Sequence, residues 1–213
     1  MDGPAVGILI SGSGSNMVAL VRAMQAGRVS ARPAVVVSSE PAAPGLDKAR
    51  ALGVAAAVVD HRAFGADRAG FDAEVNARLR EAGAGIVACA GFMRIMTPVL
   101  IEAWAGRMLN IHPSLLPLFK GLDTHARALA AGVCVHGATV HEVTLELDAG
   151  RILGQAVVPV LVGDTARTLA ARVLACEHLL YPHVLADFVR DPQAARRNRV
   201  ALFPGEQGSE GSR

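Results

Sequence analysis

The stretch AVGILISGSGSN, residues 5–16, decides the fold. Its first half is a continuous apolar run rich in β-branched residues, which is typical of a strand buried on both faces of a sheet. The run ends at the Gly/Ser loop SGSGSN (11–16), and a helix-like pattern follows from about residue 16 to residue 26. A strand, a glycine-rich loop and a helix in this order indicate the first βα unit of a parallel α/β fold.

The chain then repeats this alternation. Further strand-like runs lie at 34–37, 54–59, 85–92 and 107–112, and helix-like segments lie at 45–53 and 67–83. Strands that alternate with helices at this spacing predict an α/β protein. We expect a Rossmann-like, open, twisted and mostly parallel sheet with helices on both faces.

The pattern changes after residue 130. Two strand-like runs, 133–144 and 151–160, are separated by a short connection, so they predict an antiparallel strand pair toward the C-terminal end. Segment 165–189 is typical of a long amphipathic helix. We therefore expect a single domain over residues 1–190 and a polar C-terminal tail, 191–213, that is partly disordered.

Composition excludes several classes of protein. The chain has 213 residues, 52% of them hydrophobic, which suits one compact domain. Its formal net charge is +2 and no Lys/Arg cluster stands out, so no nucleic-acid partner is expected. No apolar run is long enough to span a membrane, and the first one follows Asp2 and is too short for a signal peptide. These features predict a cytoplasmic protein without a membrane partner.

The chain has three cysteines, Cys89, Cys134 and Cys176. Their odd number and wide spacing argue against a disulfide framework and against a zinc site. We expect three buried thiols in a reducing compartment.

The SGSGSN loop favours a phosphate ligand. Glycines let the backbone approach a phosphate closely, and a helix N-terminus offers free N–H groups. The plainer interpretation is a tight βα turn in which Ser and Asn cap the helix. A dinucleotide is the alternative ligand, since Glu40 after the second strand could hold a ribose. However, Met17 occupies the third glycine position of Gly-x-Gly-x-x-Gly, which weakens that interpretation.

The stretch MLNIHPSLLP (108–117) ends a strand with two polar side chains. Asn110 and His112 are two residues apart and project from the same face, at the strand end where open α/β sheets bind ligands. An amide N–H and an imidazolium at one point can stabilise an oxyanion. The plainer alternative is a polar strand end closed by hydrogen bonds.

Asp148, in the loop sequence ELDAG, suits either a turn or a carboxylate that orients a histidine. His125, His136 and His141 match no zinc spacing with His112, so no metal is expected.

The stretch AGFMRIM (90–96) leaves the fourth strand and carries Arg94 between apolar side chains. A flexible apolar rim with one cation suits a flat heteroaromatic ligand. A covered edge of the core would have the same pattern.

Five stretches, taken together, resemble the phosphoribosylglycinamide formyltransferase family of folate-dependent enzymes. They are ISGSGSN, AGFMRIM, LNIHPSLLP, GATVHEVTLELDAG and EHLLYP, and the similarity runs from about residue 5 to residue 188. The resemblance implies the formyltransferase fold and a cytoplasmic enzyme of purine biosynthesis and one-carbon metabolism. It implies transfer of the formyl group of 10-formyltetrahydrofolate to the amine of glycinamide ribonucleotide, by direct attack without a covalent enzyme intermediate and without a metal.

The resemblance also implies site residues. Asn110, His112 and Asp148 match the catalytic trio, in which the first two donate to the oxyanion and Asp148 keeps His112 protonated. The residues expected to bind glycinamide ribonucleotide are Gly14, Ser15, Asn16 and Glu177. The residues expected to bind folate are Arg68, Met93, Arg94, Ile95, Met96, Asn110, Thr144, Leu145, Glu146, Leu147 and Asp148.

The chain departs from the family at three positions. Glu40 stands where relatives often carry a basic residue, Asp123 stands where a histidine is common, and Leu174 replaces a polar residue that commonly helps bind the substrate phosphate. These departures concern substrate affinity and the 118–123 loop. The catalytic trio is intact.

Four other functions are weighed against this one. A methionyl-tRNA formyltransferase would need a further C-terminal RNA-binding domain, and a 10-formyltetrahydrofolate hydrolase would carry an N-terminal regulatory domain ahead of the strand at residue 5. Another amine formyltransferase would share the trio, whereas a non-catalytic folate- or nucleotide-binding module would have no need of it. The expected partners are small-molecule substrates, with the chain acting as a monomer or homodimer. The sequence leaves open whether Leu116–Pro117 is cis.

Overall fold

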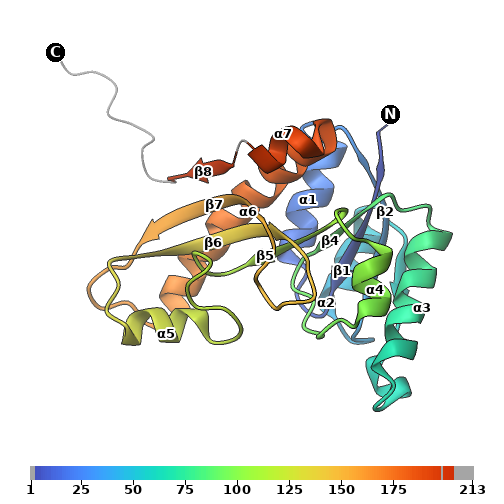
Figure 1. Cartoon of the computed structure of the whole chain (residues 1–213), viewed down its shortest axis with the longest axis horizontal. Helices are drawn as coiled ribbons and strands as arrows, with labels where there is room; N and C mark the ends of the chain where they lie inside the picture. The colour runs from blue at the N-terminus through green and yellow to red at the C-terminus, as the bar shows by residue number, and fades with distance from the viewer. Residues whose placement is uncertain (1–2, 198, 204–213) are drawn as a thin grey trace.

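The strands form one open sheet in the computed structural model, which describes residues 3–197 and 199–203 (Figure 1). Within that range the strand order is β3-β2-β1-β4-β5-β6-β7-β8. The strands are β1 (Ala5–Ile10), β2 (Arg32–Ser38), β3 (Ala56–Val58), β4 (Ile86–Cys89), β5 (Met108–His112), β6 (Val135–Glu142), β7 (Ile152–Pro159) and β8 (Val200–Leu202). β1 to β5 are mutually parallel, whereas β6 is antiparallel to both β5 and β7. The predicted mostly parallel sheet and its antiparallel pair are confirmed.

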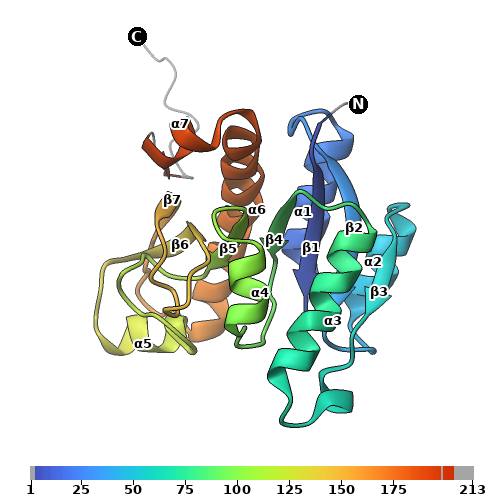
Figure 2. The same cartoon turned by 45° about the vertical axis from the view of Figure 1, so that its right-hand side comes forward.

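Helices cover both faces of this sheet, as predicted (Figure 2). They are α1 (Ser15–Gln25), α2 (Pro44–Ala51), the 3₁₀ helix η1 (His61–Phe64), α3 (Arg68–Glu81), α4 (Pro98–Ala103), α5 (Thr124–Ala130), α6 (Ala166–Arg190) and α7 (Pro192–Arg197). β1 shows why there are two layers. Its Ile8 packs into a core with α1 and α6, whereas the adjacent Leu9 packs into a separate core with α3 and α4.

The order of the strands fixes where a ligand can bind. β1 lies between β2 and β4, so the chain direction across the sheet reverses there, and the loops after β1 and β4 diverge. In open α/β sheets the crevice at such a point holds the ligand. The two loops are joined directly, because the Ser11 N–H donates to the Gly91 carbonyl at 2.9 Å.

The segment after α6 contains regular structure within the expected tail. α7 and β8 lie at the edge of the sheet beside β7, and β8 pairs with β7 in parallel (Figure 1). Val200 and Leu202 pack against the core that contains α6, which accounts for the ordering of this stretch. The polar end, GEQGSEGSR (205–213), lies outside the described residues.

The three cysteines are free. Cys89 and Cys176 are buried, as predicted, but Cys134 is exposed because it lies in the bend just before β6. The prediction of three buried thiols was therefore wrong for Cys134. Separately, no helix in the described part of the chain combines the length and apolar character needed to cross a bilayer.

Candidate active site

The end of β5 carries Asn110 and His112 into the interior of the molecule. His112 is buried and Asn110 is half-buried, and each faces a residue of β6 in the antiparallel register. The chain then turns through a cis Leu116–Pro117 bond, which answers the question left open by the sequence. Thr139 of β6 holds this turn, since its hydroxyl donates to the Ser114 carbonyl at 2.6 Å and accepts from the Leu116 N–H at 3.0 Å.

Asp148 reaches the same point from the loop between β6 and β7. Its Oδ2 lies 3.4 Å from His112 Nδ1 and accepts a hydrogen bond from the Gly121 N–H at 2.9 Å. Its backbone φ is 49°, a left-handed conformation that aspartate adopts more readily than most residues. The structure therefore brings Asn110, His112 and Asp148 together in one buried polar cluster.

Both ring nitrogens of His112 face acceptors. Nδ1 faces the Asp148 carboxylate, and Nε2 lies 3.0 Å from the Phe119 carbonyl. A carbonyl oxygen can only accept a hydrogen bond, so Nε2 carries the proton in that contact. An imidazole with an acceptor at each nitrogen is suited to the protonated, doubly donating form.

His141 is the functional residue that the sequence did not assign to this cluster. Its Nδ1 lies 2.8 Å from the Glu142 carbonyl and therefore carries the ring proton. Burial lowers the pKa of His141, more than the nearby Asp148 raises it, so the ring is neutral and its Nε2 is an acceptor. Asn110 Nδ2 lies 3.2 Å from that Nε2. The Asn110 amide is thus oriented, with its second N–H available to a ligand.

The register of the two strands makes this contact. Asn110 on β5 lies opposite His141 on β6. Nothing in the sequence fixes which residue of the second strand faces Asn110, so the only available signal was the presence of a histidine in GATVHEV.

The Gly/Ser loop and Glu177 lie in direct contact. Gly14 has a φ of 69° and precedes α1 without a side-chain cap, so the Ser and Asn side chains do not cap this helix. Instead, Asn16 Nδ2 donates to Glu177 Oε2 at 2.6 Å. Burial raises the pKa of Glu177, and the hydrogen bond from Asn16 opposes that shift. A buried carboxylate therefore lies beside the start of α1.

Two further contacts hold these elements in place. Tyr181, one turn after Glu177 on α6, has its hydroxyl 3.2 Å from the Cys89 carbonyl and 3.0 Å from the Leu109 carbonyl, which fixes α6 against β4 and β5. Lys48 of α2 donates to the Ser13 carbonyl at 2.8 Å, which brings a cation to the Gly/Ser loop.

Most of the predicted folate-binding residues lie on two loops, whereas Arg68 begins α3 and Asn110 lies on β5. Residues 93–96 follow β4, and residues 144–148 follow β6. Four large apolar side chains on these loops are exposed to solvent: Met93, Ile95, Leu145 and Leu147. Exposed apolar side chains of this size are typical of a ligand or partner surface.

Polar contacts fix the same two loops. Arg68, the first residue of α3, donates to the Ile95 carbonyl of the first loop at 2.8 Å. Arg94 Nε donates to the Met93 carbonyl at 2.7 Å, and Met96 packs on the core under α3. On the second loop, Thr144 donates to the Glu146 carbonyl, and the Glu146 carboxylate pairs with Lys120 at 3.1 Å.

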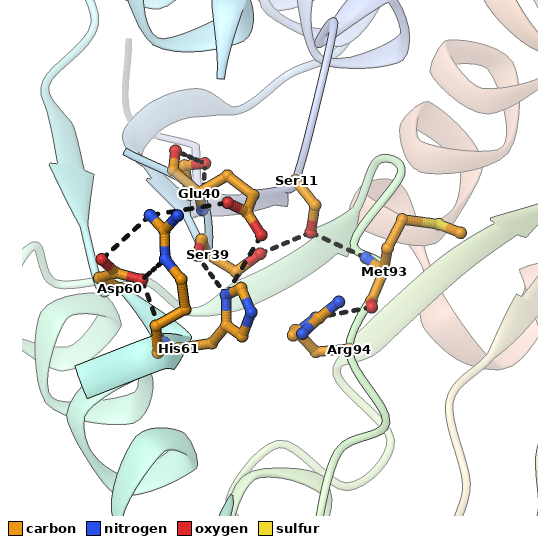
Figure 3. A network of polar contacts seen from close by, with 9 residues as sticks. Ser11, Ser39, Glu40, Asp60, His61, Met93 and Arg94 are labelled. Carbon is orange, nitrogen blue, oxygen red and sulfur yellow. Dashed lines mark hydrogen bonds and ion pairs between the residues drawn. The ribbon is translucent and has the colours of Figure 1, made fainter. Parts of the chain in front are cut away.

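The three departures from the family occupy different positions. Glu40 is paired with His61, with 3.2 Å between Oε1 and Nδ1, and the Arg62 guanidinium lies 3.9 Å from its other oxygen (Figure 3). A carboxylate already engaged by two basic groups is poorly placed to hold a ribose. Asp123 precedes α5 with a φ of 55° and makes no side-chain cap, and Leu174 lies partly exposed on α6.

His125 and His136 lie edge to face, with ring centroids 5.4 Å apart. Burial lowers the pKa of His136 to about 4, so its ring is neutral near neutral pH. Among residues 3–197 and 199–203, no three His, Cys, Asp or Glu side chains gather as a metal site would require.

Comparison with known proteins gives one consistent family. The Formyl transferase family matches residues 5–185. The phosphoribosylglycinamide formyltransferase of Escherichia coli (strain K12) is 42% identical over 94% of this chain and 93% of its own length. The human trifunctional purine biosynthetic protein adenosine-3 is 45% identical over 84% of this chain, which spans only 18% of that protein.

Solved structures agree with the sequence relatives. Glycinamide ribonucleotide transformylase 1 from Symbiobacterium toebii has a TM-score of 0.86 and 44% identity, over 88% of both chains. Phosphoribosylglycinamide formyltransferase from Brucella melitensis has a TM-score of 0.84 and 49% identity, over 88% of this chain and 96% of that one.

Proposed function

This chain belongs to the Formyl transferase family, and we propose that it transfers the formyl group of 10-formyltetrahydrofolate to the amine of glycinamide ribonucleotide. The products are formylglycinamide ribonucleotide and tetrahydrofolate, in de novo purine biosynthesis. The observation that carries the proposal is the buried cluster of Asn110, His112 and Asp148 at the end of β5. The chain acts in the cytoplasm as a monomer or homodimer on small-molecule substrates, without nucleic acid, membrane or metal.

The reaction begins with attack of the substrate amine nitrogen on the formyl carbon. A new C–N bond forms, and the carbonyl electron pair moves to oxygen. The free N–H of Asn110 and the Nε2–H of His112 donate to that oxyanion. The carbon–N10 bond of the folate then breaks as the carbonyl reforms. His112 passes its Nε2 proton to the leaving N10, and the proton lost by the attacking nitrogen returns to the His112 ring, so no net proton is gained or lost.

Asp148 and His141 act through their neighbours. The Asp148 carboxylate, 3.4 Å from His112 Nδ1, favours the protonated ring. Neutral His141 accepts from Asn110 and so holds the amide with its nitrogen toward the reacting carbonyl. The Phe119 carbonyl occupies the His112 Nε2–H at 3.0 Å, so the formyl oxygen must take its place during the reaction.

The two substrates bind to different parts of the site. The backbone N–H groups of Gly14, Ser15 and Asn16 at the start of α1 hold the phosphate of glycinamide ribonucleotide. The Glu177 carboxylate accepts from its ribose hydroxyls. The pterin ring lies between residues 93–96 and 144–148, where backbone groups of both loops read its edge, and Arg68 contacts the folate.

The decisive experiment mixes the purified protein with 10-formyltetrahydrofolate and follows tetrahydrofolate release with and without glycinamide ribonucleotide. Release that depends on glycinamide ribonucleotide supports the proposal. Release without it indicates the hydrolase, and release only with a different amine indicates another formyltransferase. No release under any condition indicates a folate- or nucleotide-binding module.

A further inference from the structure

Side chains from other elements hold the loop after β4. Residues 93–97 form neither helix nor strand. Ser11 Oγ accepts from the Met93 N–H at 2.8 Å, and Arg68 donates to the Ile95 carbonyl at 2.8 Å. Asp72 Oδ2 accepts from both the N–H and the hydroxyl of Thr97. Every second residue of the loop is therefore fixed by a side chain that lies outside it.

Of the side chains that hold this loop, Ser11 is the one that belongs to the Gly/Ser loop (Figure 3). Its hydroxyl lies 2.7 Å from the Ser39 hydroxyl, and Ser39 is fully buried. Either hydroxyl can donate in this contact, because the Ser11 oxygen can accept from the Met93 N–H in both cases. The Ser11 oxygen is thus held from two sides, and it presents a fixed acceptor to Met93.

We propose that Ser11 is a positioning residue of the folate site, an inference that rests on the proposed function. Its hydroxyl fixes the Met93 N–H and with it the first residue of the apolar rim formed by residues 93–96. Ser11 itself does not touch the substrate. Through this one side chain, the loop assigned to the substrate phosphate also sets the wall assigned to the pterin.

The Ser11→Ala variant isolates this contact. The backbone bond from the Ser11 N–H to the Gly91 carbonyl remains, so the loops after β1 and β4 stay joined. The Met93 N–H and the Ser39 hydroxyl both lose their Ser11 partner, and the Ser39→Ala variant controls for the second loss. We expect the KM for 10-formyltetrahydrofolate to rise about tenfold, which corresponds to one lost hydrogen bond. The KM for glycinamide ribonucleotide should change less than about twofold, and kcat less than about threefold.

Two further variants serve as controls. Ser11→Thr keeps the hydroxyl and should restore most of the folate KM. Ser39→Ala removes the other hydroxyl of the pair but leaves the Ser11–Met93 contact, so its folate KM should stay within about twofold of wild type. A purely structural role predicts a lower melting temperature for Ser11→Ala with an unchanged folate KM, and that result would overturn the proposal. Equal effects of Ser11→Ala and Ser39→Ala would overturn it as well.

A direct measurement of folate binding tests the role of Ser11 independently of the proposed function. If the wild-type protein transfers no formyl group to glycinamide ribonucleotide, the proposed function fails. In that case, calorimetric titration with tetrahydrofolate still tests whether Ser11 positions residues 93–96 for folate binding. A Kd about tenfold weaker in Ser11→Ala than in wild type supports the role of Ser11, and equal Kd values refute it.

Discussion

At the scale of single residues, the site contains two histidines with different hydrogen-bond partners. His112 has an acceptor at each ring nitrogen, whereas His141 donates through one nitrogen and accepts through the other. Both rings are buried, and the Asp148 carboxylate lies 3.4 Å from His112 and 3.7 Å from His141. In the proposed mechanism His112 therefore faces the developing oxyanion, while His141 orients the Asn110 amide.

Asp148→Asn tests the charge on this cluster. The asparagine oxygen can still accept from the Gly121 N–H, so the loop should fold, but the charge that favours protonated His112 is lost. We expect kcat to fall by about two orders of magnitude or more. Asp47→Asn, at an exposed position on α2, is the control and should leave kcat unchanged. A loss below about threefold for Asp148→Asn would contradict the role given to this residue.

Glu177→Gln tests the buried carboxylate through stability and pH. Burial raises the pKa of Glu177 above its unfolded value, so the native state is favoured when the carboxyl is protonated and loses stability as the pH rises through the raised pKa. Glutamine has no such cost. Urea denaturation should therefore show Glu177→Gln to be more stable than wild type at neutral pH.

The stability of Glu177→Gln should also be compared with that of wild type at low pH. Below the ordinary glutamate pKa of about 4.3 the difference in stability should disappear. The KM for glycinamide ribonucleotide should rise about tenfold, because the ribose hydroxyls lose a charged acceptor. Glu102→Gln, at an exposed position on α4, should change neither quantity. A variant that is less stable than wild type at neutral pH would show that the Asn16 bond outweighs the cost of burial.

At the scale of elements, α2 supports the Gly/Ser loop by close backbone contact. The Gly45 N–H donates to the Gly12 carbonyl at 3.1 Å. A Cβ at Gly45 would lie 2.6 Å from Ile10 Cδ1, 3.0 Å from the Gly12 carbonyl oxygen and 3.1 Å from Gly14 Cα. The isoleucine methyl can move, but the two backbone atoms belong to the proposed phosphate loop. Glycine is therefore required at position 45 by space.

Gly45→Ala should displace α2 and distort the loop it supports. We expect a loss of about 1–3 kcal/mol of stability, typical of overpacking, and a higher KM for glycinamide ribonucleotide. Gly85→Ala is the matched control, because the nearest atom to its Cβ would be the Ala5 carbonyl oxygen at 3.8 Å. Chemical denaturation and initial-rate kinetics on both variants check the prediction. Equal stability of the two variants would argue against close packing at Gly45.

At the scale of the whole molecule, the residues of the site come from distant parts of the chain and meet at one edge of the sheet. The parallel core was predictable because its strands are continuous apolar runs, such as AVGILI. The proximity of Asn110, His112 and Asp148 could be expected because the first two share a strand face and the Asp148 loop completes a family pattern. The contact between Asn110 and His141 was not predictable, because it depends on the register of β5 against β6.

The elements near the C-terminus could not be predicted for a related reason. α7 has only six residues and β8 has three, which is too short for a periodic pattern to be recognised. Contacts made elsewhere in the fold stabilise them. Arg196 Nε donates to Glu142 Oε1, Arg196 Nη2 donates to the Gly106 carbonyl at 2.9 Å, and the guanidinium lies over the Phe188 ring.

Arg196 therefore joins α7 to the rest of the molecule, and removing its side chain should lower the stability of the whole fold. Glu142 precedes the loop that carries Asp148, and the side chains of both Arg196 and Glu142 are mostly buried. Arg196→Ala would leave a largely buried carboxylate without its partner, so we expect a loss of about 3 kcal/mol. Arg197→Ala, at an exposed position on the same helix, should change stability by less than about 0.5 kcal/mol. Urea denaturation of both variants measures the difference, and equal midpoints would show that Arg196 does not fasten α7 to the fold.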